Sequence, residues 1–402
     1  MRKILLFEPL GNGRAGHEID NLIEDANLFK EKFSIFAFVN KDFDTNFRVP
    51  SFIKLIKTCE FKKKNYLKSL FIYLCYFIKE EKLIFFFFAI IRNWFSIPNY
   101  FLSFYLKYKQ FSFNENDIIV LESARDKDIE LFYFIFLLEK KFPSLHIKVR
   151  YPPKKKKLKN FFYYSNKFNN NKLLNKKFFL YTEIKSNTLI IKKFLTINVF
   201  KYEQPYKFYS RKYLTKKEYT LGFLGESRNE KGFYQLPELI KKIQSIKNIN
   251  FNFIIQVSNK IYENTIDARE EIMKLSKNNK NIKIFIGHLS YLKWRNLLKK
   301  IDIMPIIYNG NYFNSQGSGI LNSSLSHEIP VVIPSDSKFL KKNLKFKCFC
   351  EAKNIDEYVE KCILISKNYK KYLFNSKNQS NYLKKFLLEK DSFVKNILIS
   401  NK

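Results

Sequence analysis

Short apolar segments alternate with longer amphipathic segments along most of this sequence. Apolar runs of strand length occur in the first half at residues 4–7, 33–39 and 118–121, and the segments between them include stretches with apolar residues at helical spacing. A second series starts at residues 220–224 and repeats the alternation up to residue 334. Strands that alternate with helices of this length are typical of doubly wound, mostly parallel sheets. The sequence therefore predicts an α/β protein with two Rossmann-like domains.

A polar stretch over residues 201–219 separates the two series. We predict an N-terminal domain over residues 1–205, a C-terminal domain over residues 206–370 and a helical segment over residues 371–402. A chain of 402 residues can supply two domains of ordinary size, each with its own core. Its 46% hydrophobic and 18% aromatic content excludes a disordered chain.

The cysteines give no sign of a disulfide framework or a zinc site. They number five, they lack metal-ligand spacing, and none of the four histidines belongs to a Cys/His cluster. The apolar run at the N-terminus is too short for the core of a signal peptide, and the longest apolar block, residues 83–91, falls well short of the roughly 20 residues of a spanning helix. These features favour a cytoplasmic protein without a transmembrane segment.

Charge is the strongest compositional bias, with a formal net charge of +36. The lysines are spread along the whole chain among Asn, Ile, Phe and Tyr, which indicates a general compositional drift more than one binding patch. A field of this sign attracts anionic partners in either case, such as polyphosphate ligands and anionic lipid surfaces. No nucleic-acid recognition module is visible, so nucleic acid is not the expected partner.

Two lysine-rich stretches of the N-terminal domain are harder to assign. Residues 51–61, 66–79 and 83–108 predict helices rich in aromatic residues and lysine. They fit either buried helices of the domain or a basic, aromatic face that lies on the inner leaflet of a membrane. Residues 154–177 show no strong period, and we expect a mobile insertion there.

A glycine-rich turn follows the first predicted strand. Gly11, Gly13 and Gly16 have the spacing of a dinucleotide-binding loop. The acidic residue that should end the second strand is missing, however, since the first candidate after that strand is Asp42. A nicotinamide or flavin nucleotide is therefore not the expected ligand.

A second glycine loop lies in the C-terminal domain, between a strand that ends at Ile307 and a helix that begins near Gly319. Glycines let backbone N–H groups approach a ligand, and a helix N-terminus carries partial positive charge. Gly317, Ser318 and Gly319 therefore predict a site for a phosphate or diphosphate. The alternative is an ordinary α/β turn that holds no ligand.

Arg228 and Lys231 lie in another turn of the same domain, within residues 225–232 after its first strand. Because ligands of doubly wound sheets bind at the carboxyl ends of the strands, both turns can face the cleft between the domains. A guanidinium, an ammonium and a row of backbone N–H groups fit a diphosphate better than a neutral ligand. A solvated turn is the alternative in so basic a chain.

The C-terminal half resembles the donor-binding domain of GT-B glycosyltransferases, specifically those of the retaining family 4. The resemblance covers about residues 218–340 and rests on the order of these residues: Gly225, Arg228, Lys231, Gly232, Gly287, Asp302, Tyr308, Tyr312, Ser318, Gly319 and Pro330. The N-terminal half is similar only in layout and in the loop from Gly13 to His17.

This resemblance implies a GT-B fold, with two Rossmann-like doubly wound domains that face a central cleft. It also implies a nucleotide-diphosphate sugar on the C-terminal domain, a glycan or glycolipid acceptor on the N-terminal domain, and no metal. The C-terminal helix is expected to pack back on the N-terminal domain.

Roles for single residues follow from the same comparison and from the expected chemistry. Arg228 and Lys231 would stabilise the negative charge that grows on the leaving diphosphate, and His17 would contact the acceptor or the sugar, although a structural histidine is an equal alternative. The other expected donor-binding residues are Gly225, Tyr308, Gly317, Ser318, Gly319 and Ser323. The expected acceptor-binding residues are Gly13, Arg14, Glu122 and Arg150, of which the last two also fit solvated loop residues.

The sequence departs from the family at one pair of positions. Two glutamates, eight residues apart in the family, fall on Ser315 and Ser323. Ser323 can form only an uncharged hydrogen bond in place of the carboxylate that holds the donor's ribose.

Three functions remain open. The first is a glycosyltransferase of the hexosyltransferase type (EC 2.4) that acts in cell-envelope polysaccharide or glycolipid synthesis, at the inner face of an anionic membrane. The second is a GT-B-like nucleotide-sugar-binding protein that has lost catalysis, and the third is a basic nucleic-acid-binding protein. The combined motifs favour the first.

Overall fold

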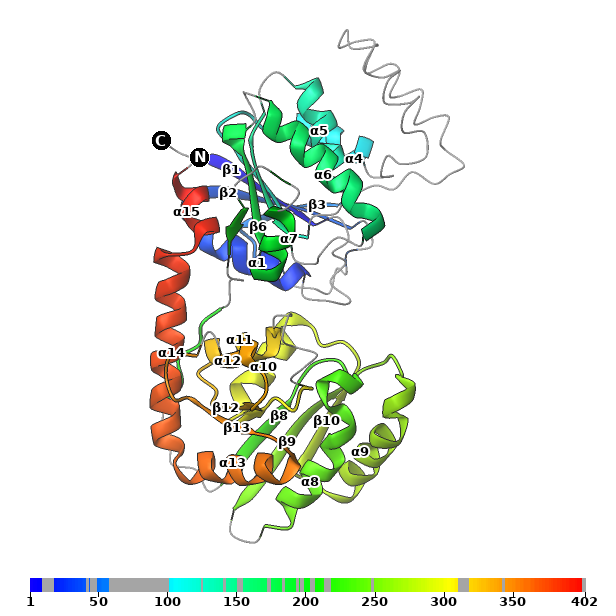
Figure 1. Cartoon of the computed structure of the whole chain (residues 1–402), viewed down its shortest axis with the longest axis vertical. Helices are drawn as coiled ribbons and strands as arrows, with labels where there is room; N and C mark the ends of the chain where they lie inside the picture. Colours follow the sequence, from blue (N-terminus) through cyan, green and yellow to red (C-terminus); the bar gives the residue numbers. More distant parts are fainter. Residues whose placement is uncertain are drawn as a thin grey trace. The chain divides into compact units, whose positions relative to one another are not determined.

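The structure is a computed structural model. It describes residues 1–8, 18–40, 43, 49–57, 101–123, 126–139, 142–149, 155–171, 175–182, 185–192, 195, 199–202, 207–212, 218–246, 249–309, 318–341 and 344–399. The chain forms two compact units (Figure 1). Unit 1 consists of Met1–Pro205 and Asp391–Lys402, and unit 2 of Tyr206–Lys390. Among the described residues, no helix is both long and apolar enough to cross a bilayer.

In the part of unit 1 that the structure describes, seven parallel strands form one sheet in the order β3-β2-β1-β4-β5-β6-β7. The strands are β1 (Arg2–Glu8), β2 (Phe33–Val39), β3 (Ile53–Lys57), β4 (Ile118–Leu121), β5 (Ser144–Val149), β6 (Phe178–Thr182) and β7 (Val199–Lys201). The strand order reverses between β1 and β4, which pair in register from Ile4 with Ile118. Such a reversal is the point at which doubly wound sheets usually bind a ligand.

Helices cover both faces of this sheet. They are α1 (Glu18–Phe29), α4 (Phe101–Gln110), α5 (Asp126–Leu138), α6 (Lys155–Asn170), α7 (Lys185–Lys192) and α15 (Ser392–Ile399). Leu5 and Phe7 of β1 share one core cluster with apolar residues of α4, α5 and α6. On the opposite face, Phe29 of α1 packs edge-on against Phe393 of α15, with ring centroids 5.8 Å apart.

Two predictions for unit 1 are wrong. Residues 155–170 form the helix α6, not a mobile insertion, because Phe161, Tyr164 and Phe168 recur at helical spacing and are buried in the core. Ile53–Lys57 is the edge strand β3 in place of a predicted helix, and it pairs with β2 from Ile53 to Lys57. In α4, Phe104, Tyr105 and Tyr108 are buried in the domain core, whereas residues 58–100 lie outside the described residues.

Unit 2 contains two groups of parallel strands that join into one sheet. The strands are β8 (Glu218–Phe223), β9 (Asn250–Val257), β10 (Ile282–Ile286), β11 (Met304–Pro305), β12 (Val331–Pro334) and β13 (Phe349–Ala352). A parallel bridge between Leu221 and Ile303 connects β8 to the segment that enters β11, and the Gly222 N–H donates to the Ile303 carbonyl at 3.1 Å. The resulting order is β10-β9-β8-β11-β12-β13, the same doubly wound order as the first six strands of unit 1.

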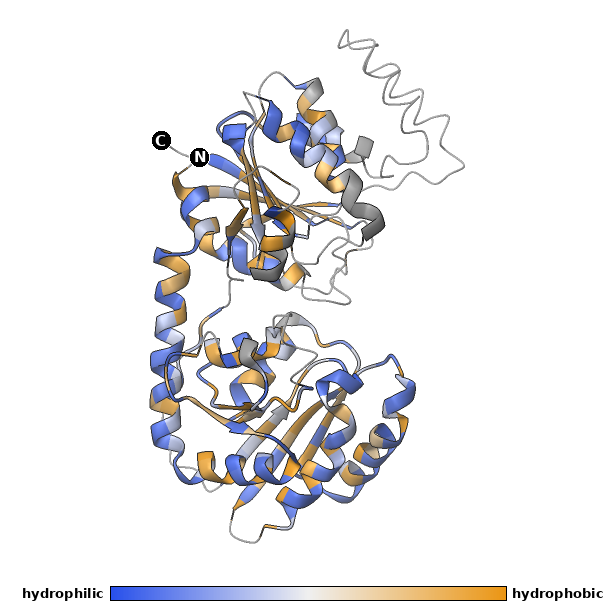
Figure 2. Cartoon of the chain, viewed as in Figure 1, coloured by the Kyte–Doolittle hydropathy of each residue, from blue (hydrophilic) through white to orange (hydrophobic). Residues whose placement is uncertain are grey.

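Unit 2 also has helices on both faces of its sheet. One core cluster contains residues of α8 (Leu236–Gln244), α9 (Ile266–Asn278) and α13 (Ile355–Lys367), and the other contains residues of α10 (Tyr291–Lys300) and α11 (Gly319–Ser326). The hydrophobic residues concentrate on the strands of both sheets, whereas α9, α13 and α14 (Tyr369–Glu389) mix both kinds (Figure 2). The predicted α/β class with two doubly wound sheets is confirmed.

The predicted C-terminal segment of residues 371–402 is divided between the units. Helix α14 belongs to unit 2, where Leu373 is part of the core, and α15 belongs to unit 1. The division falls between Lys390 and Asp391. Asp391 begins the last helix, because its carboxylate accepts hydrogen bonds from the N–H groups of Phe393 and Val394 at 2.9 and 3.0 Å.

Candidate functional site

The carboxyl ends of β8, β9 and β10 in unit 2 are tied together by one side chain, that of Gln256. Its Oε1 accepts from the Gly225 N–H at 2.9 Å, and its Nε2 donates to the Gly287 carbonyl at 2.9 Å. An amide side chain can do this because it carries a donor and an acceptor. Gly225 has a φ of +128°, which only glycine adopts readily. The loop that follows β8 therefore leaves the sheet at a fixed angle.

Reciprocal hydrogen bonds fix the next residues of this loop. The Ser227 N–H donates to Ser258 Oγ at 2.7 Å, and the Ser258 N–H donates to Ser227 Oγ at 2.9 Å. Both serines are buried. Because each hydroxyl satisfies a backbone donor of the other strand end, the loop lies firmly on the end of β9.

The far end of the loop is pressed against the segment that follows β11. Gly232 adopts the left-handed conformation with φ +72°, and a Cβ at this position would lie 1.8 Å from the Ile307 carbonyl oxygen. The Asn309 N–H donates to the Glu230 carbonyl at 3.0 Å. These contacts bring residues 228–231 close to Tyr308, which precedes the second glycine loop.

Lys231 is a partly buried cation in this loop. Its ammonium would lie 3.5 Å from a Cβ built on Gly225, so it lies close to the glycine backbone. Burial, together with the positive charge of Arg228, lowers the pKa of Lys231 to about 8. No carboxylate of the described residues lies within ion-pair distance of this ammonium. The charges of Glu226 and Glu230 oppose this lowering without contacting the ammonium, and a partly buried cation that no carboxylate contacts favours binding of an anion.

Arg228 lies beside Lys231 but is already paired. Its Nε is 3.1 Å from Oε2 of Glu226, and its Nη1 is 2.9 Å from Oε1 of Glu230. The arginine side chain is 29% exposed. Arg228 and Lys231 therefore differ in their contacts, since Arg228 forms ion pairs with two carboxylates and Lys231 forms none with the described residues.

The second glycine loop ends at the N-terminus of α11. Ser318 is the N-cap residue, and its Oγ accepts from the Leu321 N–H at 3.2 Å. Tyr308 hydrogen-bonds to the Ser318 side chain; burial raises the pKa of this tyrosine to about 12, and the hydrogen bond and the charge of Arg228 oppose the rise. A Cβ on Gly319 would meet no atom of the described residues within 4 Å, so there is room beside the first helical residue.

Several residues predicted to bind the donor are thus close together. Lys231 lies beside Gly225 and Arg228. Tyr308 is near enough to Arg228 for the positive charge to affect its pKa, and it forms a hydrogen bond with Ser318. Ser323 lies one turn along α11 from Gly319 and is 8% exposed. The other predicted site residues in the two units, apart from Glu122, lie outside the described residues: Gly13, Arg14, His17, Arg150 and Gly317. Ser315 also lies outside them.

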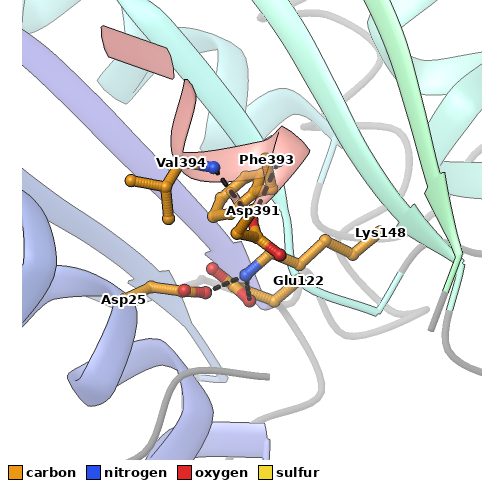
Figure 3. Close-up of polar contacts among 6 residues, drawn as sticks. All are labelled: Asp25, Glu122, Lys148, Asp391, Phe393 and Val394. Atoms are coloured by element: carbon orange, nitrogen blue, oxygen red, sulfur yellow. Dashed lines mark hydrogen bonds and ion pairs between the residues drawn. The ribbon is translucent and has the colours of Figure 1, made fainter. Parts of the chain in front are cut away.

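Glu122 has a different environment from the one predicted. It follows β4 in unit 1 and is fully buried, with its Oε2 3.2 Å from the Lys148 ammonium (Figure 3). The same ammonium pairs with the buried Asp25 of α1 and lies 4.0 Å from the ring centroid of Phe393. The acceptor-binding role predicted for Glu122 does not fit this burial, and neither does the alternative of a solvated loop residue. Its carboxylate is committed to a buried ion cluster.

Three residues of the site were not selected from the sequence. Gln256 interrupts the buried apolar run of residues 253–257 in β9, and that interruption is a signal that could have identified it. Glu226 and Glu230 flank Arg228 at a spacing of two residues. Their role depends on a loop conformation that no local pattern reveals.

Comparisons with known proteins agree with this architecture. A scan against known protein families finds no match, and a search of curated protein sequences finds none either. Among solved structures, a TarM variant from S. aureus is similar with a TM-score of 0.62 and 11% identity, over 100% of this chain and 99% of that one.

Sucrose-phosphate synthase from Thermosynechococcus elongatus is similar with a TM-score of 0.59 and 9% identity, over 95% of each chain. HepE from Anabaena has a TM-score of 0.55 and 9% identity, over 99% of this chain and 98% of HepE. At these identities the likeness concerns the fold. The chain has the GT-B fold of glycosyltransferases.

Proposed function

We propose that this chain is a glycosyltransferase that moves a sugar from a nucleotide-diphosphate sugar to a hydroxyl acceptor. The observation that carries the proposal is the ammonium of Lys231, a partly buried cation without a carboxylate partner among the described residues. It lies against Gly225, next to Arg228, at the carboxyl edge of a doubly wound sheet. A diphosphate is the ligand class whose oxygens would pair directly with this ammonium.

In the proposed reaction the acceptor hydroxyl replaces the nucleoside diphosphate at the anomeric carbon. Negative charge grows on the leaving diphosphate as its bond to the sugar breaks. Lys231 and the N-terminus of α11 would stabilise that charge more strongly in the transition state than in the bound donor. The cation at Lys231 would then contribute to the rate as well as to donor affinity.

The ligands bound in two similar structures support this substrate class. The HepE structure is a complex with UDP-glucose, and the TarM variant is a complex with fondaparinux, α-GlcNAc-glycerol and UDP. Together with the family 4 resemblance, they support a nucleotide sugar as the donor, and we propose a cell-envelope polysaccharide or a glycolipid as the acceptor. We also propose that it works in the cytoplasm at an anionic membrane face, and that transfer needs no added metal, which a chelator would test.

Turnover of nucleotide sugars tests the proposal directly. The chain is incubated with UDP-, GDP- and ADP-sugars and candidate glycan acceptors, while release of the nucleoside diphosphate is measured. Lys231→Ala should lower nucleotide affinity at least about tenfold, since a hydrogen bond to a charged group contributes roughly 1.5–3 kcal/mol. Lys241→Ala is the matched control, because Lys241 pairs with Glu271 and its side chain is 56% exposed on α8. Failure of every nucleotide sugar to bind at millimolar concentration would rule the function out.

A binding protein without catalysis is the second candidate. It is favoured by Ser323, which stands where the family has a carboxylate and is only 8% exposed. Tight binding of a nucleotide sugar without turnover, across a wide acceptor panel, would support this alternative. Transfer to any acceptor would exclude it.

A further inference from the structure

The pairing of Arg228 with Glu226 and Glu230 sets it apart from the neighbouring Lys231. We propose that these two carboxylates are internal competitors for the donor's diphosphate, which must displace them before Arg228 can bind it. The inference rests on the proposed function and concerns regulation of the same site. It predicts that the chain holds nucleoside diphosphates more weakly than its basic residues alone would allow.

The geometry allows such an exchange. A guanidinium presents several N–H donors in a plane, and carboxylate and phosphate oxygens compete for the same donors. Carboxylate oxygens of Glu226 and Glu230 lie 3.1 and 2.9 Å from two different nitrogens of Arg228, and the Nε that faces Glu226 makes no hydrogen bond, so this nitrogen is available to a phosphate oxygen. The Glu226 side chain is 59% exposed, so its ion pair is weak and easily broken in water.

Glu230 is held more firmly than Glu226. Its side chain is 24% exposed, and its carbonyl accepts from the Asn309 N–H at 3.0 Å. Asn309 directly follows Tyr308, so the backbone that carries this glutamate is joined to the segment leading into the second glycine loop. The carboxylate therefore stays beside the site when Arg228 turns to a ligand.

An arginine paired with two carboxylates is unusual in so basic a chain. The sequence contains 73 Lys and Arg residues and only 37 Asp and Glu residues, yet the arginine of this loop forms ion pairs with two carboxylates. Two acids and two bases, among them Lys231, leave the four charged side chains with no net charge. A site built only for anion affinity would keep its arginine unpaired.

The consequence concerns release as well as binding. When the nucleoside diphosphate begins to leave, the carboxylates can recapture Arg228, and the departing anion then loses one of its partners. Competition of this kind lowers affinity for donor and product together. It shortens the residence time of the product, because differences in affinity between closely related complexes arise mostly from dissociation rates.

Calorimetric titration of UDP and GDP into the full chain tests this proposal. Glu226→Gln and Glu230→Gln keep the side-chain shape and remove the charge, and each should tighten nucleotide binding about two- to fivefold. Glu271→Gln on α9 is the matched control; it changes the net charge equally and should leave affinity unchanged, because Glu271 pairs with Lys241. In an Arg228→Ala background, the gain from either glutamine should disappear.

The direction of the change in nucleotide affinity shows whether the two carboxylates compete with the ligand or help to bind it. Weaker binding in the glutamine variants would show that the carboxylates orient Arg228 for the ligand, and unchanged binding would show that they do not act on the site; either result overturns the proposal while the proposed function stands. Circular dichroism confirms that each variant is folded. Absence of nucleotide binding by the chain and by all its variants would overturn both.

Discussion

Replacing Lys148 with methionine should strongly destabilise unit 1. The lysine, Asp25 and Glu122 are all fully buried, and the ammonium pairs with both carboxylates (Figure 3). Lys148→Met keeps most of the side-chain volume but leaves two buried acids without their cation. Breaking a buried ion pair from one side costs roughly 3–5 kcal/mol, because the remaining charge stays out of water.

That cost is a large fraction of the stability of a domain, which is roughly 5–15 kcal/mol. For a unit of this size, each kcal/mol lowers the Tm by roughly 2–4 °C, so the variant should lose about 6–20 °C. The contact of the ammonium with the Phe393 ring at 4.0 Å is lost as well and adds to the effect. Thermal and urea unfolding, followed by circular dichroism, measure the change.

The loss should also depend on pH. Burial, with the nearby charge of Glu122, raises the pKa of Asp25 well above its ordinary value of 3.8, and removal of the lysine takes away the charge that opposes this rise. A raised pKa means that the folded state binds more protons than the unfolded state, so stability falls as pH rises above about 4. The difference between the variant and the natural chain should therefore be smaller at pH 5 than at pH 8.

Lys109→Met is the matched control within unit 1. Lys109 pairs with Glu139 at 3.2 Å, but its side chain is 38% exposed, so the cost should be roughly 0.2–1 kcal/mol. If Lys148→Met cost no more than this control, or if its cost grew at low pH, the assignment of a buried, charged cluster would be refuted.

Three further predictions concern single residues. Affinity for nucleoside diphosphates should fall as pH rises above about 8, where the free Lys231 loses its proton, and Lys231→Met should remove this dependence in calorimetric titrations across pH 7–9.5. Gly232→Ala should cost unit 2 at least roughly 1–2 kcal/mol in urea unfolding, because the left-handed backbone disfavours a Cβ and the methyl group would meet the Ile307 carbonyl, whereas Gly319→Ala should cost little. Phe393→Ala should destabilise unit 1 by roughly 3–5 kcal/mol in the same assay, since its ring is buried, and an unchanged transition would contradict its place in that core.

The architecture was largely predictable because the apolar strands are short, well separated and buried on both faces, as β4 is over Ile118–Leu121. Helix α6 was missed because lysines and asparagines obscured the spacing of Phe161, Tyr164 and Phe168. Strand β3 was missed because Ile53–Lys57 is a partly exposed edge strand, and its short pattern fits a helix as well.

At the candidate site, residues with a local sequence pattern were predictable, whereas contacts between residues far apart in the sequence were not. Gly225, Lys231 and Ser318 were selected because glycine loops and cations after strands have a recognisable spacing. The environment of Glu122 was not predictable, since its partner Lys148 is 26 residues away and the pair forms only after β4 and β5 align. The pairing of Arg228 with its neighbouring acids requires a particular backbone path, which the order of residues alone does not specify.

The discontinuity of unit 1 affects how the chain can fold during synthesis. Its core includes Phe393, Val394 and Ile397, which leave the ribosome only after all of unit 2 has been made. N-terminal domains usually complete their folding first. In this protein unit 2 can complete its core first. The core of unit 1 is complete only when α15 covers Lys148, Asp25 and Glu122. A nascent chain stalled before Asp391 would therefore leave that face of unit 1 open to chaperones.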